Sequence, residues 1–386
     1  MITDYRNINA YSDYKASGYP IKHKRKVPFD PQIRLGLEYR KIFMNILEMD
    51  RVLNEIVLTA GDYLDLVNDV YSSNIHWSVS IEGNPLTREE VRRISTSFFK
   101  DAGYLEKRDG PAQEILNHLH SHLAVADMFR LPWDSDTVRN THRMLTANTG
   151  IEGGSGIFRR TEAEIRDPKD GFVYMIPCPS KDIRDETDSL LEWLKTSPYD
   201  AAVTATLFFH EFESIHPFTD GNGRTGRTLF RILLQELGLK NSKLCRFEEE
   251  ILGSLSTYYD LLGYTDQRSD YGPLIFYISA ALEKAYERAV TEFGAKNVLK
   301  DLDEASKTLA VRSKKEQWFS LSDAAGWVPS LGEQRIGQKL KALAEMGVLE
   351  KRGNTRSTRF RFRDPFADIR KSSQKRMDEC SKDADL

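Results

Sequence analysis

One stretch of twelve residues, 216–227, combines side chains that could do chemistry on an anionic substrate. Its sequence is His-Pro-Phe-Thr-Asp-Gly-Asn-Gly-Arg-Thr-Gly-Arg. His216 can accept a proton near neutral pH, and Asp220 offers the carboxylate oxygen that Mg²⁺ prefers as a ligand. Arg224 and Arg227 carry guanidinium groups, which can bind phosphate bidentately. These residue types together indicate a site for a nucleotide polyphosphate.

The surrounding sequence predicts the elements that must position this stretch. Apolar side chains recur at helical intervals over residues 201–212 and again over 224–237, where Gly238 stands in the place of a C-terminal cap. A glycine-rich turn that leads into a helix presents unpaired N–H groups and the positive end of the helix dipole. We therefore expect a helix, an anion-binding loop and a second helix, in that order.

Two nucleotide-binding motifs and one plain alternative compete for these residues. Gly221, Gly223 and Gly226 match the dinucleotide-binding fingerprint, and residues 221–228 miss the P-loop pattern only at Arg227, where that motif has lysine. Both motifs follow a strand, whereas the upstream segment here has helical periodicity. A plain glycine turn with two solvated arginines and a packed histidine would explain one or two of these residues and not all twelve.

The stretch resembles the signature of Fic-domain proteins, His-x-Phe-x-(Asp/Glu)-Gly-Asn-Gly-Arg-x-x-Arg, and matches it at every fixed position. The resemblance extends from about residue 75 to about residue 285. Residues 156–159 and 174–177 look like the flap of that family, and 258–262 is similar to its Tyr-Tyr-x-x-Leu element beside the adenine. The resemblance implies a mainly α fold, with a Fic helical core and a small β-hairpin flap.

The resemblance also implies an activity, that of a protein adenylyltransferase. Such an enzyme transfers AMP from ATP to a Ser, Thr or Tyr hydroxyl of a target protein, which could be the enzyme itself. His216 would remove the proton of the hydroxyl, and Asp220 would position Mg²⁺. The residues implied to bind or frame the nucleotide are Phe218, Gly221, Asn222, Gly223, Arg224, Gly226, Arg227, Tyr258 and Tyr259. Those implied to dock the target are Tyr174, Met175 and Ile176.

A second motif lies far upstream of the first. Residues 78–83 resemble the inhibitory motif of the same family, (Ser/Thr)-x-x-x-Glu-(Gly/Asn), with Ser78, Glu82 and Gly83 at its fixed positions. The resemblance implies that Glu82 pairs with Arg227, the residue expected to hold the γ-phosphate. A carboxylate in that position would neutralise the receptor and repel the anion, so the enzyme would be autoinhibited. The plain alternative is a surface glutamate near the end of a helix.

Strong turn chemistry at residues 167–171, Asp-Pro-Lys-Asp-Gly, separates two short extended segments, 160–166 and 172–177. We expect a β-hairpin beside the phosphate loop. Its edge could pair with an extended target segment by strand addition, or the hairpin could only cover the core.

The pattern changes again near the C-terminus. A strand is expected at 318–321, helices at 322–327 and 331–346, and a hairpin over 347–362, an order that resembles a winged helix. The hairpin and its end carry a basic cluster consisting of Lys351, Arg352, Arg356, Arg359, Arg361 and Arg363. Contact with DNA phosphates and docking to another protein both fit this cluster. An alternative function is therefore a nucleotide-sensing, DNA-binding transcriptional regulator with a Fic core.

We expect the chain to be organised in five parts. These are an N-terminal arm and helices with the inhibitory motif (1–95), a Fic catalytic core (96–290), a linker (291–314), a winged-helix domain (315–364) and a charged tail (365–386). The first thirty residues are rich in tyrosine and basic residues and lack periodicity. They suggest an arm draped over a domain or over a partner subunit, and we expect a homodimer.

Composition narrows the class of protein further. The net charge of −3 gives no bulk attraction to nucleic acid or to anionic membranes. The three cysteines, Cys178, Cys245 and Cys380, are far apart and form neither a disulfide framework nor a metal motif. The most apolar run, residues 272–282, is too short to span a bilayer. We expect a cytoplasmic protein with no membrane partner.

Overall fold

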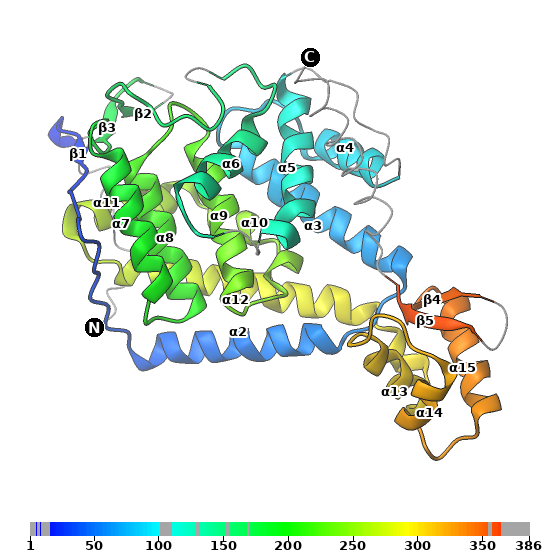
Figure 1. The fold of residues 1–386 in the computed structure, drawn as a ribbon. Helices are drawn as coiled ribbons and strands as arrows, with labels where there is room; N and C mark the ends of the chain where they lie inside the picture. The colour runs from blue at the N-terminus through cyan, green and yellow to red at the C-terminus, as the bar shows by residue number, and fades with distance from the viewer. Residues whose placement is uncertain are drawn as a thin grey trace. The chain divides into compact units, whose positions relative to one another are not determined.

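The protein is known here from a computed structural model. It describes Tyr5, Ile8 and residues 16–100, 110–128, 132–151, 154–167, 170–353 and 357–363. The chain divides into two compact units (Figure 1). Unit 1 comprises Met1–Asp50, Val70–Phe98 and Leu105–Glu287, and unit 2 comprises Arg51–Asp69, Phe99–Tyr104 and Arg288–Leu386. Each unit is described by itself.

Helices form most of unit 1. Four of the described helices contribute residues to both units, namely α2 (Leu37–Glu55), α3 (Ala60–Ser80), α4 (Arg88–Lys100) and α12 (Gly272–Ala295). The others that contribute to unit 1 are α5 (Gly110–Met128), α6 (Ser135–Thr146), α7 (Ile183–Thr196), α8 (Ala201–Ile215), α9 (Asn222–Glu236), η2 (Ser242–Leu244), α10 (Phe247–Leu252) and α11 (Leu255–Arg268). The mainly α fold that we expected is confirmed.

Helices α8 and α9 are the paired elements that carry the phosphate loop. Helix α8 is buried along almost its whole length, as its apolar residues on all sides require. Helix α9 begins at Asn222, two residues before the expected start, because Gly221 adopts a left-handed N-cap conformation with φ +77°. Gly226 lets the two helices approach closely, since a Cβ at this position would overlap Glu213 and crowd Phe212.

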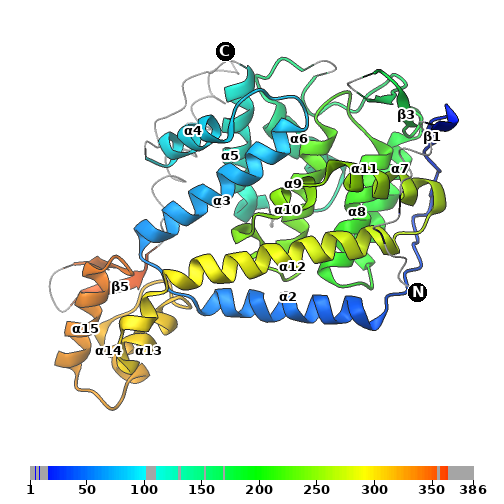
Figure 2. The same ribbon diagram turned by 180° about the vertical axis from the view of Figure 1, so that it is seen from behind.

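A three-stranded sheet belongs to unit 1 and lies near α7 and α11 in both views (Figures 1 and 2). Its strands are β1 (Ile21–Lys22), β2 (Ile165–Arg166) and β3 (Val173–Ile176), in the order β1-β3-β2. Strands β2 and β3 are antiparallel, which confirms the expected hairpin, although Pro168 and Lys169 of its turn lie outside the described residues. Strand β1 pairs with β3 in parallel and was not expected.

Unit 2 contains the elements that we expected for a winged helix. They are η3 (Val298–Asp301), α13 (Glu304–Ser313), α14 (Leu321–Trp327), α15 (Glu333–Glu345) and the antiparallel pair β4 (Leu349–Arg352) and β5 (Arg359–Phe362). Phe319 forms a single bridge to Phe360 where a strand was expected. The order and pairing are consistent with a winged helix.

One expectation about unit 2 was wrong. The segment 291–314 is not a linker, because helix α13 packs Leu309 and Ala310 into the same core as Ile336, Leu340 and Phe360. The charge-rich composition of α13 concealed the narrow apolar stripe that faces this core. The expected tail, 365–386, and Arg356 lie outside the described residues.

None of the described helices is both long and apolar enough to cross a membrane. Cys178 and Cys245 are buried free thiols, and Cys380 lies outside the described residues.

Candidate active site

The loop between α8 and α9, residues 216–221, is held rigidly by its own side chains. His216 ends α8 in a left-handed conformation with φ +53°, and its N–H donates to Phe212 O at 3.0 Å. The Asn222 side chain closes the loop, because its Oδ1 accepts from Phe218 N and its Nδ2 donates to Phe218 O, each at 2.8 Å. Phe218 is fully buried and anchors the loop.

A histidine from another helix braces the same loop. The ring of His142, on α6, stacks on Phe218 with centroids 3.7 Å apart. Its Nδ1 accepts from Gly156 N at 2.8 Å, so its Nε2–H donates to Asp220 O at 2.9 Å. Burial lowers the pKa of His142, which favours this neutral form.

Arg159 completes the bracing from the segment that resembles a flap. Its Nε donates to His216 O at 2.8 Å, and its backbone N–H donates to Pro217 O at 2.9 Å. Arg159 is itself 4% exposed. Residues 156–159 therefore fix the base of the loop and do not form a free flap.

The imidazole of His216 is oriented for proton transfer. Its Nδ1 lies 3.3 Å from Glu213 O, one turn back on α8, so Nδ1 carries the proton and Nε2 keeps its lone pair. Burial lowers the pKa of His216 to about 4, and the charge of Arg159 acts in the same direction. His216 is therefore neutral and able to accept a proton at physiological pH.

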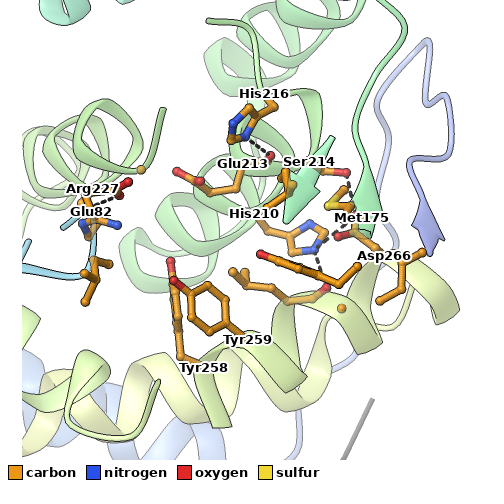
Figure 3. Close-up of a pocket in the computed structure, with 17 residues that line it drawn as sticks. Glu82, Met175, His210, Glu213, Ser214, His216, Arg227, Tyr258, Tyr259 and Asp266 are labelled. Carbon is orange, nitrogen blue, oxygen red and sulfur yellow. Dashed lines mark hydrogen bonds and ion pairs between the residues drawn. The ribbon is translucent and has the colours of Figure 1, made fainter. Parts of the chain in front are cut away.

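A cavity lies between α8, α9, α11 and the small sheet, and His216 lines it (Figure 3). Arg227 and Glu82 lie on one side of this cavity, and Met175 and Asp266 lie on the other. The lining residues that the sequence had singled out are Glu82, Tyr174, Met175, His216, Gly223, Arg227, Tyr258 and Tyr259.

Arg227 holds the upstream motif in this cavity. Its Nε donates to Ser78 Oγ at 2.9 Å, and its Nη2 donates to Ser78 O at 2.8 Å and to Glu82 Oε1 at 2.9 Å. The pair implied by the resemblance is thus present, with Arg227 only 4% exposed. Burial is the largest single influence and acts to lower the pKa of Arg227, but the neighbouring acidic side chains, Glu82 foremost, together outweigh it and the pKa is raised.

The spacing of this motif spans the end of a helix and the turn that follows. Ser78 lies in the last turn of α3, which ends at Ser80, and Glu82 lies in the turn after it. In this turn Gly83 N donates to Ser80 O and Asn84 N to Val79 O, each at 3.1 Å. These two hydrogen bonds require a residue in the left-handed conformation, and Gly83 provides it with φ +91°. Gly83 therefore stabilises the turn that carries Glu82.

Glu82 occupies the place that suits an anion. Its Oε1 lies against Gly223 in the first turn of α9, where a Cβ would overlap it. The N-terminus of a helix and a buried guanidinium both favour negative charge. The carboxylate of Glu82 is therefore the chemical equivalent of a phosphate group at this position.

Asp220 meets the requirements of a magnesium ligand. Its side chain is 50% exposed, and Oδ1 accepts from Gly221 N at 2.5 Å and from Arg224 Nη2 at 3.0 Å. Among the described residues no partner is found for Oδ2, which leaves one oxygen for a hard cation. The residues present therefore fit Mg²⁺, with Asp220 as the side chain that would hold it.

Several of the residues assigned to nucleotide binding are instead structural in this conformation. Arg224 is 3% exposed and bonds to Glu114 and Asp220, and it does not line the cavity. Both polar atoms of the Asn222 side chain are engaged by Phe218. Gly221 packs on Thr146 and His142, and Gly226 on α8.

The aromatic wall of the cavity comes from α11 and the sheet. Tyr258 and Tyr259 lie with ring centroids 5.3 Å apart, and Tyr174 of β3 meets Tyr259 edge-on at 6.1 Å. Burial raises the pKa of all three phenols, so they stay neutral. Three planar side chains suit the face of a planar ligand.

The sequence analysis missed Glu213 and Ile21, which also line the cavity. Glu213 stands three residues before His216, a helical spacing that could have placed both on one face. Burial raises the pKa of Glu213 to about 8, although Arg227 opposes this, and its Oε1 has no partner among the described residues. Ile21 had no such signal, because only the fold brings it here.

Strand addition to β3 conflicts with the pairing of the sheet. Met175 is paired with Ile21 of β1 on one edge and with Ile165 of β2 on the other. Tyr174 and Met175 line the cavity, and the carbonyl of Ile176 accepts from His23 N at 2.9 Å. Both edges of β3 are therefore occupied at Met175, and the docking of a target by Tyr174, Met175 and Ile176 stays a prediction.

Comparison with known proteins supports the resemblance. Residues 132–234 match the Fic/DOC family. The chain is 25% identical over 227 residues to "Protein adenylyltransferase Fic" of Nematostella vectensis and 26% identical over 230 residues to that of Drosophila willistoni. Each alignment covers 57% of this chain, and 49% and 41% of those relatives. The chain thus spans half or less of the curated relatives that it matches.

A solved structure has a similar fold. A Fic family protein from Desulfovibrio desulfuricans superposes with a TM-score of 0.57 at 21% sequence identity. The superposition covers 87% of this chain and 98% of the other. At this identity the likeness concerns the fold alone.

Proposed function

This chain is a Fic-domain protein, and we propose that it transfers AMP from ATP to a hydroxyl side chain of a protein. One observation carries this proposal. A neutral histidine and an anion receptor, made of Arg227 and the N-terminus of α9, line the same cavity. This combination suits a hydroxyl that attacks a phosphate, and the names of the relatives point to the same reaction.

His216 acts as the general base in this proposal. Its Nε2 takes the proton of the Ser, Thr or Tyr hydroxyl as the oxygen attacks the α-phosphorus and pyrophosphate leaves. The imidazolium that forms then places its charge on Nδ1–H, against Glu213 O. The bracing of the loop by His142, Phe218 and Arg159 keeps the ring in place during the attack.

The phosphate chain is bound by fixed charges and backbone groups. Arg227 binds the γ-phosphate in place of Glu82. The backbone N–H groups at the start of α9 donate hydrogen bonds that stabilise the negative charge developing on the phosphates. Asp220 would hold Mg²⁺, and the cation would neutralise the negative charge of the leaving pyrophosphate. The buried ion pairs of Arg224 with Glu114 and Asp220 keep the metal ligand oriented.

Glu82 inhibits the enzyme in this proposal. Its carboxylate neutralises Arg227 and fills the space over Gly223, so ATP binds with its phosphates displaced. The pair is reversible, since Glu82 is 29% exposed and lies in the turn that follows α3. The inhibition can therefore be relieved without unfolding the core.

The direct test is incubation of the protein with α-labelled ATP, alone and with a lysate of its host. We expect labelled protein bands, including the protein itself. His216→Ala should lower the labelling by roughly 10²–10⁴-fold while leaving ATP binding nearly intact. His120→Ala is the matched control, because His120 lies on α5 and packs on Phe98 away from the cavity. Undiminished labelling by His216→Ala would contradict the assignment.

A second candidate function rests on unit 2. Lys351, Arg352 and Arg359 are exposed on the β4–β5 hairpin, as contacts to nucleic-acid phosphates require. A nucleotide-sensing, DNA-binding regulator would use the Fic core as a sensor and this hairpin as the contact. A salt-dependent mobility shift with duplex DNA, with no labelling of any protein, would favour the regulator over the enzyme.

A further inference from the structure

The N-terminal strap, residues Ile21–Phe29, runs beside the β2–β3 hairpin and contributes to the wall of the cavity. Its strand β1 pairs with β3 on one side and contacts α11 on the other, where Lys24 Nζ donates to Gln267 O. The strap could be a simple cover for a sheet edge. Its anchors, and the buried Ile21 side chain of β1 that faces the cavity, indicate that the strap also contributes to the wall of the cavity.

The side chains of His23 and Lys26 anchor the strap to helices of unit 1. The His23 ring lies 2.8 Å from Glu186 Oε2, with the two side chains 1% and 2% exposed. Lys26 Nζ lies 2.6 Å from Glu211 Oε1, which also accepts from Tyr271 OH at 2.5 Å. Phe29 adds an edge-on contact with Trp193 at 5.0 Å. A strand of two residues would not persist without such anchors, and these leave it little freedom.

One anchor reaches residues that line the cavity. Ser214 Oγ donates to Asp266 Oδ1 at 2.6 Å, so it accepts from His23 Nδ1 at 2.8 Å. Ser214 and Asp266 both line the cavity. The position of the strap is therefore tied to the cavity wall through a chain of hydrogen bonds.

Ile21 itself is part of that wall. It is 4% exposed, faces the cavity and stands opposite Met175 in register. Ile165 and Leu262 line the cavity as well, so this end combines an apolar wall with the polar groups of Ser214 and Asp266. Met175 lies across the cavity from Arg227 and Glu82 (Figure 3), so the apolar end is remote from the anion receptor.

We propose that Ile21 is a nucleotide-binding residue that forms the wall against the nucleobase. The inference rests on the proposed function, since it names the part of ATP that meets the apolar end. A planar base has apolar faces, and an aliphatic side chain that is already buried and fixed contacts it at little entropic cost. The phosphates then extend toward Arg227, where the charges are.

The test compares two ligands that share only the phosphates, ATP and inorganic tripolyphosphate. Binding of each is measured calorimetrically in a Glu82→Gly parent, which leaves Arg227 without its internal carboxylate. Ile21→Ala and the bulkier Ile21→Phe are introduced into this parent. Lys22→Ala is the matched control, because Lys22 is the exposed neighbour in the same strand.

We expect both Ile21 variants to weaken ATP binding by about tenfold or more, as changes in a hydrophobic pocket do. Tripolyphosphate binding should stay within about twofold of the parent, and Lys22→Ala should bind both ligands like the parent. Equal loss of both ligands in the Ile21 variants would show that the strap only supports the fold and would overturn the proposal. Unchanged ATP binding would overturn it too, while the proposed function would stand. A parent that binds tripolyphosphate but not ATP would instead overturn the proposed function.

Discussion

Two clusters of basic residues, one in each unit, are arranged in opposite ways. In the phosphate loop, Arg224 and Arg227 are 3% and 4% exposed and are held by carboxylates. On the β4–β5 hairpin, Lys351 and Arg352 are exposed. Arg361 of that hairpin is closer to the loop arginines, since it bonds to Glu350 at 2.6 Å and lies over the Trp318 ring at 4.7 Å.

The difference shows how burial converts an arginine into a receptor. A guanidinium held in a low-dielectric site has one geometry and a strong field, so it selects a ligand of matching shape and charge. An exposed cation in water is screened by salt and attracts any polyanion. We therefore expect changes in the loop to alter chemistry strongly, and changes on the hairpin to alter only salt-dependent attraction.

The largest effect is expected from removal of the carboxylate that holds Arg227. Glu82→Gly should raise labelling with α-labelled ATP by about ten- to a hundredfold, because charge-assisted pairs are worth roughly 1.5–3 kcal/mol and 1.4 kcal/mol is about tenfold. If the Glu82–Arg227 pair causes the inhibition, the gain in labelling depends on Arg227. Glu82→Gly should therefore gain nothing in an Arg227→Ala background. Equal labelling by wild type and Glu82→Gly would return Glu82 to an ordinary surface residue.

The next effect concerns the acid limb of the pH profile. His216 must be neutral to act, and its pKa is lowered to about 4. Activity, measured as kcat/KM in the Glu82→Gly protein, should therefore fall only as the pH drops toward about 4. At pH 5 it should be about thirtyfold above the value for a histidine with the ordinary pKa of about 6.5. A limb that titrates near 6.5 would mean that the ring is solvated in the active form.

A smaller effect is expected on the hairpin. Replacement of Lys351, Arg352 and Arg359 by alanine should leave labelling within about twofold of wild type, since none of the three lines the candidate site and exposed charges contribute little. If duplex DNA binds, each lost phosphate contact should reduce the salt slope by about 0.9. Substitution is the cleaner design, because truncation before residue 315 would leave α13 with its buried Leu309 uncovered. Strongly reduced labelling by the triple variant would break the contrast between the two clusters.

The smallest effect is one of stability. Burial raises the pKa of Glu213 to about 8, so the folded state keeps a proton that the unfolded state has lost above about 4.5. Stability should consequently fall as the pH rises through this window. Glu213→Gln removes the titration and should raise Tm by a few degrees at pH 8, with less gain at pH 5. A Tm difference that does not depend on pH would mean that this carboxyl is not kept neutral.

Much of this protein was determined by the sequence alone. The positions of α8 and α9 follow from periodicity and from Gly221 and Gly238, and the hairpin follows from its turn residues. These features depend on contacts between residues close in the chain. The turn that carries Glu82 after α3 is likewise local, since Gly83 supplies its left-handed residue.

Only the tertiary structure decided which of these residues share the cavity. Asn222 and Arg224 were expected at the phosphates, yet both are engaged within the loop and its neighbours, because a rigid loop needs buried partners for its polar groups. Ile21 enters the cavity through pairing with a strand about 150 residues away, and no local pattern encodes such a contact. Local sequence thus determined the helices, the hairpin and the signature motif. Long-range packing and strand pairing determined which residues form the walls of the site.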